Sequence, residues 1–302
     1  VTLGLLLRWG RTPEQIVTVP ALEIPATPDS TPEAAPQAAI ATPLWRFTEA
    51  RDPERGIAPG ITAAPDGAIW IVDGATSGFQ IFSPEGQLIG HWGIAGEDDG
   101  EFTFAAGDSN VVGAVAFRSD GGFYVADSGN ARVQQFTSSR EFVRSWSGEG
   151  LGDGQFSRPI DVDVDDQGNV YIIDADRDEI QKFDADGSFL LSYGGSGSES
   201  GQFQDIAWGT LDAEGNFWVA DPGNDRIQQL TSDGTFLREI GPDFGIATVG
   251  GIQLNGPQAL AFDAAGSIFI ADPGNARIVV LSPEGVPIGA FGEDMLDAPM
   301  AL

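Results

Sequence analysis

The chain of 302 residues contains no cysteine and a single histidine, His91. Disulfides, thiolate nucleophiles and cysteine zinc sites are therefore excluded, and so is any metal centre built from several histidines. The sequence also lacks a Gly-x-Ser-x-Gly nucleophile elbow. His91 lies beside Trp92 in a segment that we expect to form an outer strand, where the imidazole would face solvent. We therefore predict no catalytic residue.

Basic residues are also scarce. Lysine and arginine together number 15 against 45 acidic residues, which gives a formal net charge of −30, and Lys182 is the only lysine. No basic stripe is available to neutralise phosphates, so nucleic acid and anionic lipid heads are excluded as partners. The 41 glycines and 19 prolines indicate a folded chain that is rich in turns.

The N-terminal part divides into two segments before the main domain. Residues 1–7 are apolar and precede Arg8 and Trp9, so residues 1–19 are either the remnant of a membrane span or contain an extra strand at residues 6–10. Residues 20–43 hold six prolines and seven alanines, a composition typical of an extended spacer. The third segment, residues 44–302, is predicted to be the folded domain.

This domain is built from a repeat. Five segments each combine an aromatic residue, two small or branched apolar residues and an aspartate, at residues 70–73, 124–127, 171–174, 218–221 and 269–272. Glycine-containing turn signals precede and follow these segments, for example Asp66-Gly67 before the first one. Each unit of about 50 residues therefore predicts four short antiparallel strands, which is the sequence form of a β-propeller blade.

The repeated motifs carry a family resemblance. The run from Tyr124 to Arg132, Tyr-Val-Ala-Asp-Ser-Gly-Asn-Ala-Arg, and the Asp-Gly-Gln-Phe ending at residues 153–156 resemble NHL-repeat propellers over residues 57–297. Residues 75–78 and 175–178 depart from the Gly-Asn-x-Arg turn, and residues 251–254 depart from the Gly-Gln-Phe ending. The resemblance implies a propeller fold and a face that binds a macromolecule.

We therefore predict an all-β chain, a β-propeller of four-stranded antiparallel blades, with six blades by resemblance to the family. Five blades follow from the five repeats. The sixth would be shared by the chain ends, with residues 298–302 as its inner strand, residues 44–47 as its outer strand and residues 15–24 as a further strand. Closing the ring in this way would remove exposed sheet edges.

The aspartate of each repeat and the arginine five residues later favour a structural interpretation. The aspartate can accept hydrogen bonds from the amides of the turn that follows, and the arginine can satisfy carbonyl groups or a carboxylate. The aromatic residues at positions 70, 124, 171, 218 and 269 are expected to fill the space between adjacent blades.

Three residues stand out on the predicted inner strands, which otherwise carry small residues near the propeller axis. They are Asp161, Asp163 and Trp208, and they are our candidates for a ligand site at the mouth of the channel. A structural role around water is the alternative. A looser resemblance to calcium-dependent sugar-lactonase propellers implies that acidic side chains there could hold a metal, whereas the histidine-held zinc of the family's lyases cannot be assembled with one histidine.

The third repeat is unusually acidic, with ten carboxylates between residues 161 and 186. Asp174, Asp176 and Asp178 alternate in the way that oxygen-ligated cations accept, and the repeat places them in a turn. We predict a weak, structural Ca²⁺ site there if the three side chains converge. A solvated acidic loop is the alternative, and side chains that alternate along a strand could not share an ion.

Taken together, these features predict a non-enzymatic binding or scaffold propeller that recognises a protein or glycan through one face. No cofactor is required in this interpretation, and Ca²⁺ is the one cation that the acidic repeat could bind. The spacer and the apolar start predict an extracellular or cell-surface location with a membrane tether through the N-terminus. The alternative is a Ca²⁺-dependent hydrolase or lactonase with its site at the channel mouth.

Overall fold

The computed structural model describes residues 60–104, 113–146, 150, 152–241, 253–292 and 299. These residues form five four-stranded sheets in which strands adjacent in sequence pair with one another, and the pairing is antiparallel throughout. In chain order the strands are β1 (Ile61–Ala63), β2 (Ile69–Asp73), β3 (Gly78–Phe82), β4 (Leu88–Trp92), β5 (Ala114–Phe117), β6 (Phe123–Asp127), β7 (Arg132–Phe136), β8 (Phe142–Trp146), β9 (Pro159–Val164), β10 (Val170–Asp174), β11 (Glu179–Phe183), β12 (Phe189–Gly194), β13 (Gly209–Leu211), β14 (Phe217–Asp221), β15 (Arg226–Leu230), β16 (Phe236–Ile240), β17 (Ala259–Phe262), β18 (Ile268–Asp272), β19 (Arg277–Leu281) and β20 (Pro287–Phe291). The predicted all-β fold is confirmed.

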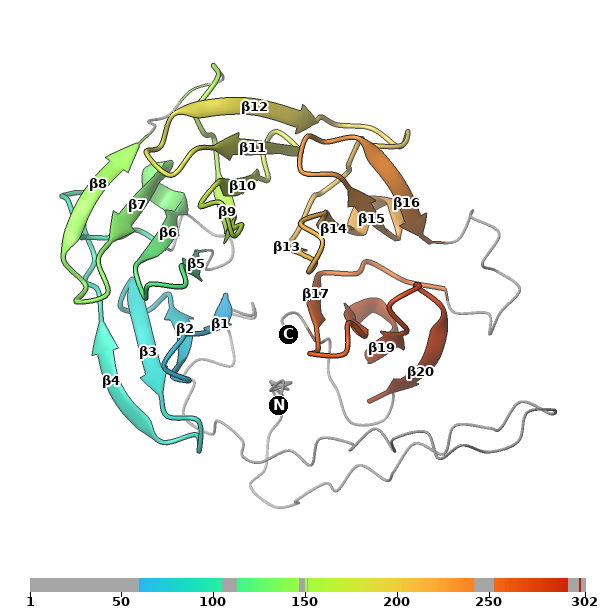
Figure 1. Ribbon diagram of the computed structural model, residues 1–302, viewed down its shortest axis with the longest axis horizontal. Helices are drawn as coiled ribbons and strands as arrows, with labels where there is room; N and C mark the ends of the chain where they lie inside the picture. The colour runs from blue at the N-terminus through green and yellow to red at the C-terminus, as the bar shows by residue number, and fades with distance from the viewer. Residues whose placement is uncertain are drawn as a thin grey trace.

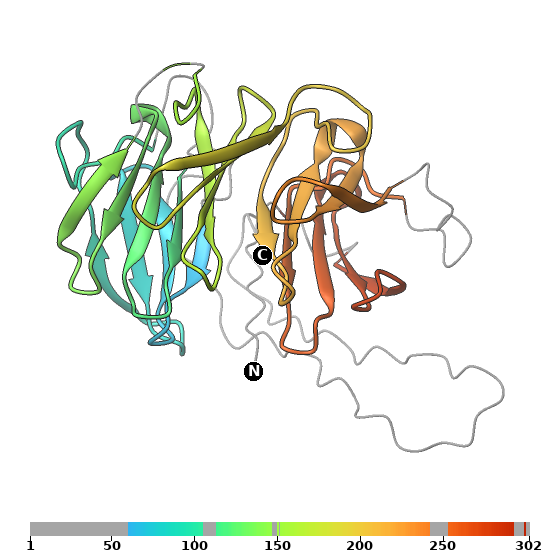
Figure 2. The ribbon, with the colours of Figure 1, turned by 45° about the horizontal axis from the view of Figure 1, so that its top comes forward.

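Each sheet is one blade of a propeller, and we number the blades 1 to 5 along the chain. Figure 1 shows the blades following one another around a central axis, with β1, β5, β9, β13 and β17 innermost and β4, β8, β12, β16 and β20 at the rim. The turned view in Figure 2 shows that the strands of each blade run between the same two faces of the molecule. The residues predicted to form a sixth blade lie outside the described residues, except for Pro299.

The turns between the strands follow the glycine signals of the sequence. Between the first and second strands of every blade a glycine with φ between +80° and +86° donates its N–H to the carbonyl of the residue three before it, at Gly67, Gly121, Gly168, Gly215 and Gly266. Only a residue without a Cβ enters this region of φ at no steric cost, which is why the predicted hairpins form at these positions.

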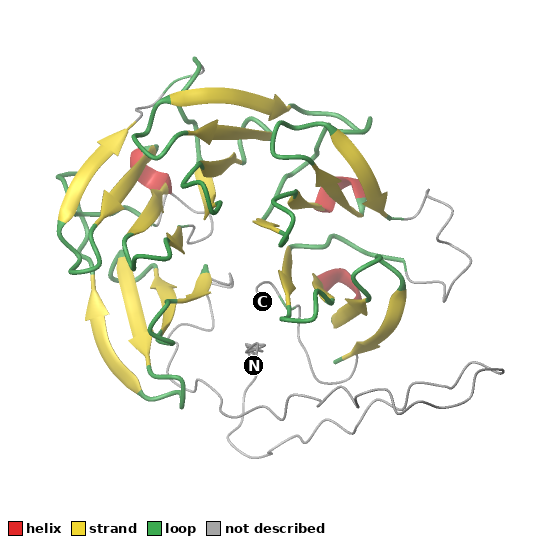
Figure 3. Ribbon diagram, in the orientation of Figure 1, coloured by secondary structure: helices red, strands yellow, loops and turns green. Residues whose placement is uncertain are grey.

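The turns between the second and third strands are of two kinds. Three of them contain short 3₁₀ helices, η1 (Ser128–Asn130), η2 (Pro222–Asn224) and η3 (Pro273–Asn275), which are the red segments in Figure 3. They belong to the three repeats that carry the Gly-Asn-x-Arg sequence. All five turns end with a residue other than glycine in the left-handed region, at Ser77, Ala131, Asp178, Asp225 and Ala276.

The outer strand of every blade contains a β-bulge in its pairing with the third strand. The extra residue is a large aliphatic one in each case: Ile89, Val143, Leu190, Leu237 and Ile288. All five side chains are exposed. A bulge bends an edge strand and interrupts its regular pattern of hydrogen-bonding groups, so each rim strand is a poor template for another strand.

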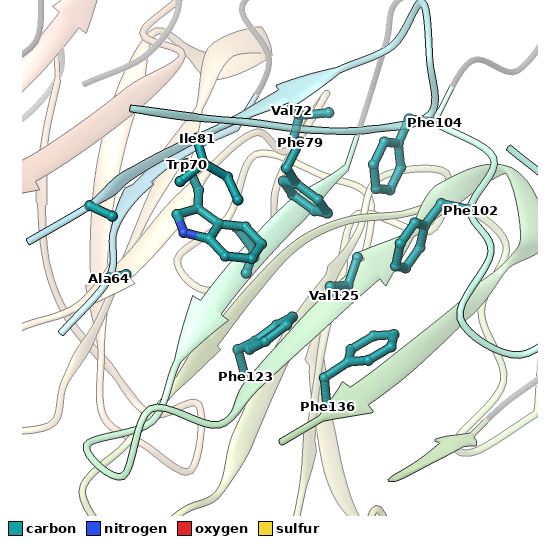
Figure 4. Packing of buried hydrophobic residues seen from close by; sticks show 12 residues of the cluster. Ala64, Trp70, Val72, Phe79, Ile81, Phe102, Phe104, Phe123, Val125 and Phe136 are labelled. Atoms are coloured by element: carbon teal, nitrogen blue, oxygen red, sulfur yellow. The ribbon is translucent and has the colours of Figure 1, made fainter. Parts of the chain in front are cut away.

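The core lies between neighbouring blades, as the positions of the repeated aromatic residues predict. Between blades 1 and 2, Trp70 contacts Phe117 and Phe123 with ring centroids 5.3 and 5.4 Å apart, and Figure 4 shows Trp70, Phe123 and Phe136 within one cluster. Tyr171 stacks on Phe217 between blades 3 and 4, and Trp218 contacts Phe262 between blades 4 and 5. Aromatic side chains thus contribute to the contacts between these blades, and between blades 4 and 5 they are joined by aliphatic residues such as Leu260 and Ile270.

We expect Phe123→Ala to lower the free energy of unfolding by about 3 to 5 kcal/mol, because the ring is 1% exposed and its removal leaves a cavity between two blades. Chemical denaturation measured by tryptophan fluorescence and by circular dichroism tests this. Val143→Ala, at a site that is 42% exposed, is the control and should change stability by less than about 0.5 kcal/mol. Equal losses for the two variants would contradict the assignment of the core.

Candidate functional site

Asp161 and Asp163, two of the three candidate residues, lie on β9, the inner strand of blade 3. In the register of β9 with β10, Asp163 is opposite Tyr171 and Asp161 is opposite Ile173. The corresponding residues of the other inner strands are small or hold a hydroxyl: Thr62 is opposite Trp70, Ala116 opposite Tyr124, Thr210 opposite Trp218 and Ala261 opposite Phe269. Blade 3 is therefore the one described blade with carboxylates at these positions.

Both carboxylates accept hydrogen bonds from backbone N–H groups of the neighbouring blade. The N–H of Gly209 donates to Asp161 Oδ2 at 2.9 Å, and the N–H of Leu211 donates to Asp163 Oδ2 at 2.9 Å. Thr210 adds a hydroxyl donor to Asp163 at 3.1 Å. The other oxygen of each side chain accepts the N–H of the next residue, Val162 or Val164. The pair therefore joins the inner strands of blades 3 and 4 through side chains.

The environment of this pair is unusual for carboxylates. Burial raises the pKa of Asp161 to about 8 against the opposing effect of the Gly209 N–H, and the nearby Asp163 carboxylate raises it further. Burial likewise raises the pKa of Asp163, where the Leu211 and Val164 N–H groups oppose the shift and Asp165 adds to it. A buried carboxyl that faces other carboxyls holds a proton at higher pH than an exposed one.

Trp208, the third candidate, directly precedes the β13 residues that bind the two carboxylates. Its N–H donates to the carbonyl of Gln258 at 3.2 Å, and its own carbonyl accepts the N–H of Ala220 at 3.0 Å. The partly buried indole packs against the apolar clusters of blades 4 and 5. The structure thus brings together three candidates from different repeats, where the inner strand of blade 3 meets that of blade 4.

Of the three aspartates of the predicted calcium site, Asp174 ends β10, and Asp176 and Asp178 lie in the turn that follows, but the three side chains bind different partners. Asp174 accepts the N–H groups of Ser157 and Arg158, and Asp176 pairs with the Arg158 guanidinium at 2.6 Å. Asp178 accepts from Ser196 and from the N–H of Ile206 in the next connection. In the part of the chain that the structure describes, no group of three or more His, Cys, Asp or Glu residues could hold a metal ion. The calcium site stays a prediction of the sequence.

A more extensive arrangement, which the sequence revealed only in part, surrounds the aspartate that ends the second strand. In blade 2, Asp127 is fully buried and accepts the N–H of Thr103 at 2.7 Å, Asn130 Nδ2 at 2.9 Å and Arg132 Nε at 2.7 Å. Thr103 belongs to the connection from blade 1. The turn that follows therefore contributes the side-chain amide of Asn130, whereas the backbone amide comes from the preceding connection.

Arginine and glutamine complete this arrangement. Arg132 donates to the carbonyls of Glu97, Asp98 and Glu101, and Gln134 donates to the carbonyl of Glu101 and accepts the N–H of Gly100. We call this arrangement the loop clasp. It consists of the aspartate that ends a second strand and the asparagine, arginine and glutamine side chains that bind it or the preceding connection. Burial raises the pKa of Asp127, while the Thr103, Asn130 and Arg132 donors oppose that shift.

The loop clasp recurs with variations in the later blades. Asp221 accepts the N–H of Gln204, and Asp272 accepts the N–H of Asn255, each with its own asparagine and arginine. In blade 3, where the Gly-Asn-x-Arg turn is missing, Arg177 and Gln181 instead donate to the carbonyl of Gln155. A glutamine seven residues after the aspartate recurs in blades 1 to 4 and is the sequence signal that could have identified the full clasp.

The single histidine lies on the outer strand of blade 1, opposite Gln80 of β3. His91 is exposed on β4, as the sequence predicts, and Trp92 beside it is partly buried between blades 1 and 2. Of the basic residues in the described ranges, every one contacts a carboxylate, a carbonyl or an aromatic ring of the chain.

Comparison with known families identifies one segment. A model of the NHL repeat family matches residues 109–136, which include β5, β6 and β7. This match confirms the NHL resemblance for the second blade. The search of curated proteins gave no match.

Solved structures share the fold. A streptogramin B lyase is 17% identical, with 81% of this chain and 72% of that chain covered at a TM-score of 0.57. A catalytically inactive histidine-to-alanine variant of virginiamycin B lyase from Staphylococcus aureus, with quinupristin, is 13% identical, with 80% and 72% covered at 0.56. A chain of a nidogen/laminin complex is 16% identical, with 82% and 84% covered at 0.55. At these identities the comparisons show the propeller fold alone.

We expect removal of the buried carboxylate from the loop clasp to be strongly destabilising. Asp127→Ala leaves Arg132 and the Thr103 N–H without their acceptor, and should lower the free energy of unfolding by about 3 to 5 kcal/mol. Asp176→Ala, which removes a half-exposed partner of Arg158, should cost no more than about 1 kcal/mol. Urea unfolding compares the two, and a small effect of Asp127→Ala would show that the clasp is dispensable.

The buried pair on β9 predicts a pH dependence of stability. The raised pKa of Asp161 means that the folded state keeps a proton between pH 4 and about 8 that the unfolded state has lost. This contribution to stability is therefore fully present below pH 4 and is lost as the pH rises toward 8, by up to about 1.4 kcal/mol per pH unit.

Urea unfolding of the wild type and of Asp161→Asn at a series of pH values isolates this contribution, because the variant has no proton to lose at this position. The difference in unfolding free energy between the two proteins should change in favour of the variant as the pH rises. Asp166→Asn, at an exposed neighbouring position, should keep the wild-type profile. Parallel profiles for the wild type and Asp161→Asn would refute the assignment.

Proposed function

We propose that the chain is a non-enzymatic binding or scaffold module that recognises a protein or a glycan through one face of the propeller. The observation that supports this is the contrast between its two faces. One face carries the tight glycine hairpins between first and second strands, which have nearly the same geometry in all blades. The other carries the connections between blades, which differ in sequence and whose described parts are residues 93–104, 152–158, 195–208 and 253–258.

The connection face suits recognition because its loops are varied while their bases are fixed. The loop clasps bind the connections at Thr103, Ser157, Gln204 and Asn255 to the buried ends of second strands. Varied loops on a rigid base are the usual location of binding residues. The presence of a nidogen/laminin complex among proteins of the same fold supports a protein partner for such a face.

The enzymatic alternative is a Ca²⁺-dependent hydrolase or lactonase at the channel mouth. Asp161 and Asp163 are the acidic side chains that favour it, but their oxygens already accept N–H groups of blade 4 and of their own strand. Lyases of the same fold include a variant that is inactive after replacement of a histidine. The one histidine of this chain is exposed on the outermost strand of blade 1. The binding function therefore has the stronger support.

We propose that the module is displayed outside a membrane. The spacer at residues 20–43 would hold the propeller away from the surface, and the apolar residues 1–7 would belong to a tether. No helix of the described ranges has the length and apolar character needed to cross a membrane.

Binding to a panel of glycans and extracellular matrix proteins, including laminin, tests the proposed function. We expect at least one member to bind, and the double variant Asp153→Arg/Asp205→Arg on the connection face to abolish this binding. Asp153 and Asp205 are exposed in two different connections. The matched control, Glu85→Arg/Glu214→Arg, changes two exposed residues of the hairpin face and should bind like the wild type.

A panel of lactone substrates in the presence of Ca²⁺ provides the opposing test. Turnover of any of them by the purified protein, lost on chelation or in Asp163→Asn, would support the hydrolase and overturn the binding module. If the connection-face variant binds normally and the hairpin-face variant does not, the partner binds the hairpin face, and the proposed role of the connection face is wrong.

We further propose that a sixth blade closes the ring. The aromatic residue that faces the next blade is 0 to 3% exposed at Trp70, Tyr124, Tyr171 and Trp218, whereas Phe269 of blade 5 is only partly buried. On blade 1, Ile69 and Ile71 belong to an apolar cluster with Ile61, and the described members of this cluster all come from blade 1. Both apolar surfaces would be covered by the strand segments at residues 44–47 and 298–302 that the sequence predicts.

If Trp45 packs in this blade, Trp45→Ala should lower the free energy of unfolding by about 3 kcal/mol or more. Trp45 would then behave like a core residue although it precedes the first repeat. Pro28→Ala in the spacer is the control and should leave stability unchanged. Unchanged unfolding of the Trp45 variant, measured by circular dichroism, would exclude residues 44–47 from the folded domain.

A further inference from the structure

The rim of blade 1 exposes more large aliphatic side chains than the rim of any other described blade. Leu88 is 48% exposed, Ile89 is 60% exposed and Ile94 is 61% exposed, and all three lie on β4 or directly after it. They are three of the eight large hydrophobic residues that are exposed in the described ranges. A concentration of this kind on a protein surface is typical of a binding site.

The other outer strands limit such exposure. Arg144 lies on β8, Arg238 and Glu239 lie on β16, and β20 begins with Pro287. The uncharged strand β12 exposes one large aliphatic residue, Leu190. Charged residues and prolines on edge strands protect a protein against unwanted association, and β4 has neither. Its exposed residues therefore differ from the single exposed aliphatic residue that the bulge produces in every blade.

Acidic residues lie directly beside this apolar surface. Glu97, Asp98 and Asp99 follow Ile94 and are exposed. Their loop is fixed in position, because Arg132 of blade 2 donates to the carbonyls of Glu97 and Asp98 at 2.8 Å. Arg132 binds these carbonyls and the carboxylate of Asp127. The side-chain carboxylates of Glu97, Asp98 and Asp99 are exposed, and no basic side chain of the described ranges forms an ion pair with them.

We infer that residues 88–99 form a docking surface for a polypeptide segment that carries large aliphatic side chains followed by a cluster of lysine or arginine. The aliphatic side chains would cover Leu88, Ile89 and Ile94, and the basic cluster would pair with the carboxylates at residues 97–99. Because residues 97–99 are negatively charged, they attract a basic segment and repel a second copy of this acidic chain. This inference rests on the proposed binding function and names the partner for the rim of blade 1, which runs along β4 from the hairpin after β3 to the connection that begins at residue 93.

Selection of a displayed library of random peptides on the full chain tests the inference. The enriched peptides should combine large aliphatic residues with lysine or arginine, and their affinity should fall at higher salt. Fluorescence anisotropy of the best peptide should show at least about tenfold weaker binding to Ile89→Ser/Ile94→Ser. Asp98→Asn/Asp99→Asn should weaken binding and reduce its salt dependence.

The bulge residues of two other blades provide the matched control. Val143→Ser/Leu190→Ser removes two exposed aliphatic side chains, 42% and 47% exposed, at the rim positions that correspond to Ile89, and should bind the peptide like the wild type. Thermal melting of each variant checks that it is folded, and exposed substitutions of this kind should leave the melting temperature nearly unchanged.

Three results would overturn the inference. They are the absence of enriched peptides, enriched peptides without basic residues, and unchanged peptide binding by Ile89→Ser/Ile94→Ser. Sedimentation velocity addresses a second copy as the occupant: a wild-type dimer that becomes monomeric in this variant would also overturn the proposal. A member of the panel of glycans and matrix proteins could bind the wild type and Ile89→Ser/Ile94→Ser equally but not Asp153→Arg/Asp205→Arg. That result would support the proposed function and reject this inference alone.

Discussion

The buried carboxylate at the end of a blade's second strand is the constraint on which the rest of the propeller depends. A connection between blades must leave the rim, cross one face and enter the next inner strand, and its backbone groups would otherwise lack partners where they are buried. Asp127, Asp174, Asp221 and Asp272 each accept at least one amide of such a connection. The aromatic packing between blades has a fixed geometry because these connections hold consecutive blades at a defined distance.

This constraint also explains how an acidic chain uses its few basic residues. Arginines serve in the loop clasps of blades 2, 4 and 5, where each one satisfies a buried carboxylate and carbonyl groups together. Others bridge blades or cover aromatic rings, as Arg144 does with Asp186 and Arg238 does with Trp218. In the described ranges the basic side chains contact other groups of the chain, so acidic groups dominate the exposed surface and favour partners of positive charge.

Local features of the fold could be predicted from the sequence, and contacts between blades could not. The glycine hairpins, the strand order and the aromatic positions depend on residues within one repeat. The hairpins and the strand order are confirmed in the five described blades, and the aromatic residue packs against the next blade in the first four of them. The partners of Asp161 and Asp163 come from a strand almost fifty residues later, so their role at the junction of blades 3 and 4 has no local signature. Asp178 illustrates the same limit, because its left-handed backbone conformation directs its carboxylate toward the next connection and away from Asp174.

The bulge in every outer strand has a consequence for how such a chain can change its number of blades. Because the extra residue is encoded within each repeat, a duplicated blade brings its own interrupted edge with it. A newly added blade would therefore be protected against edge-to-edge pairing from the moment it arises, without any compensating substitution elsewhere. Growth or loss of whole repeats is thus compatible with solubility, whereas a deletion confined to one bulge would create a regular edge capable of pairing with another chain.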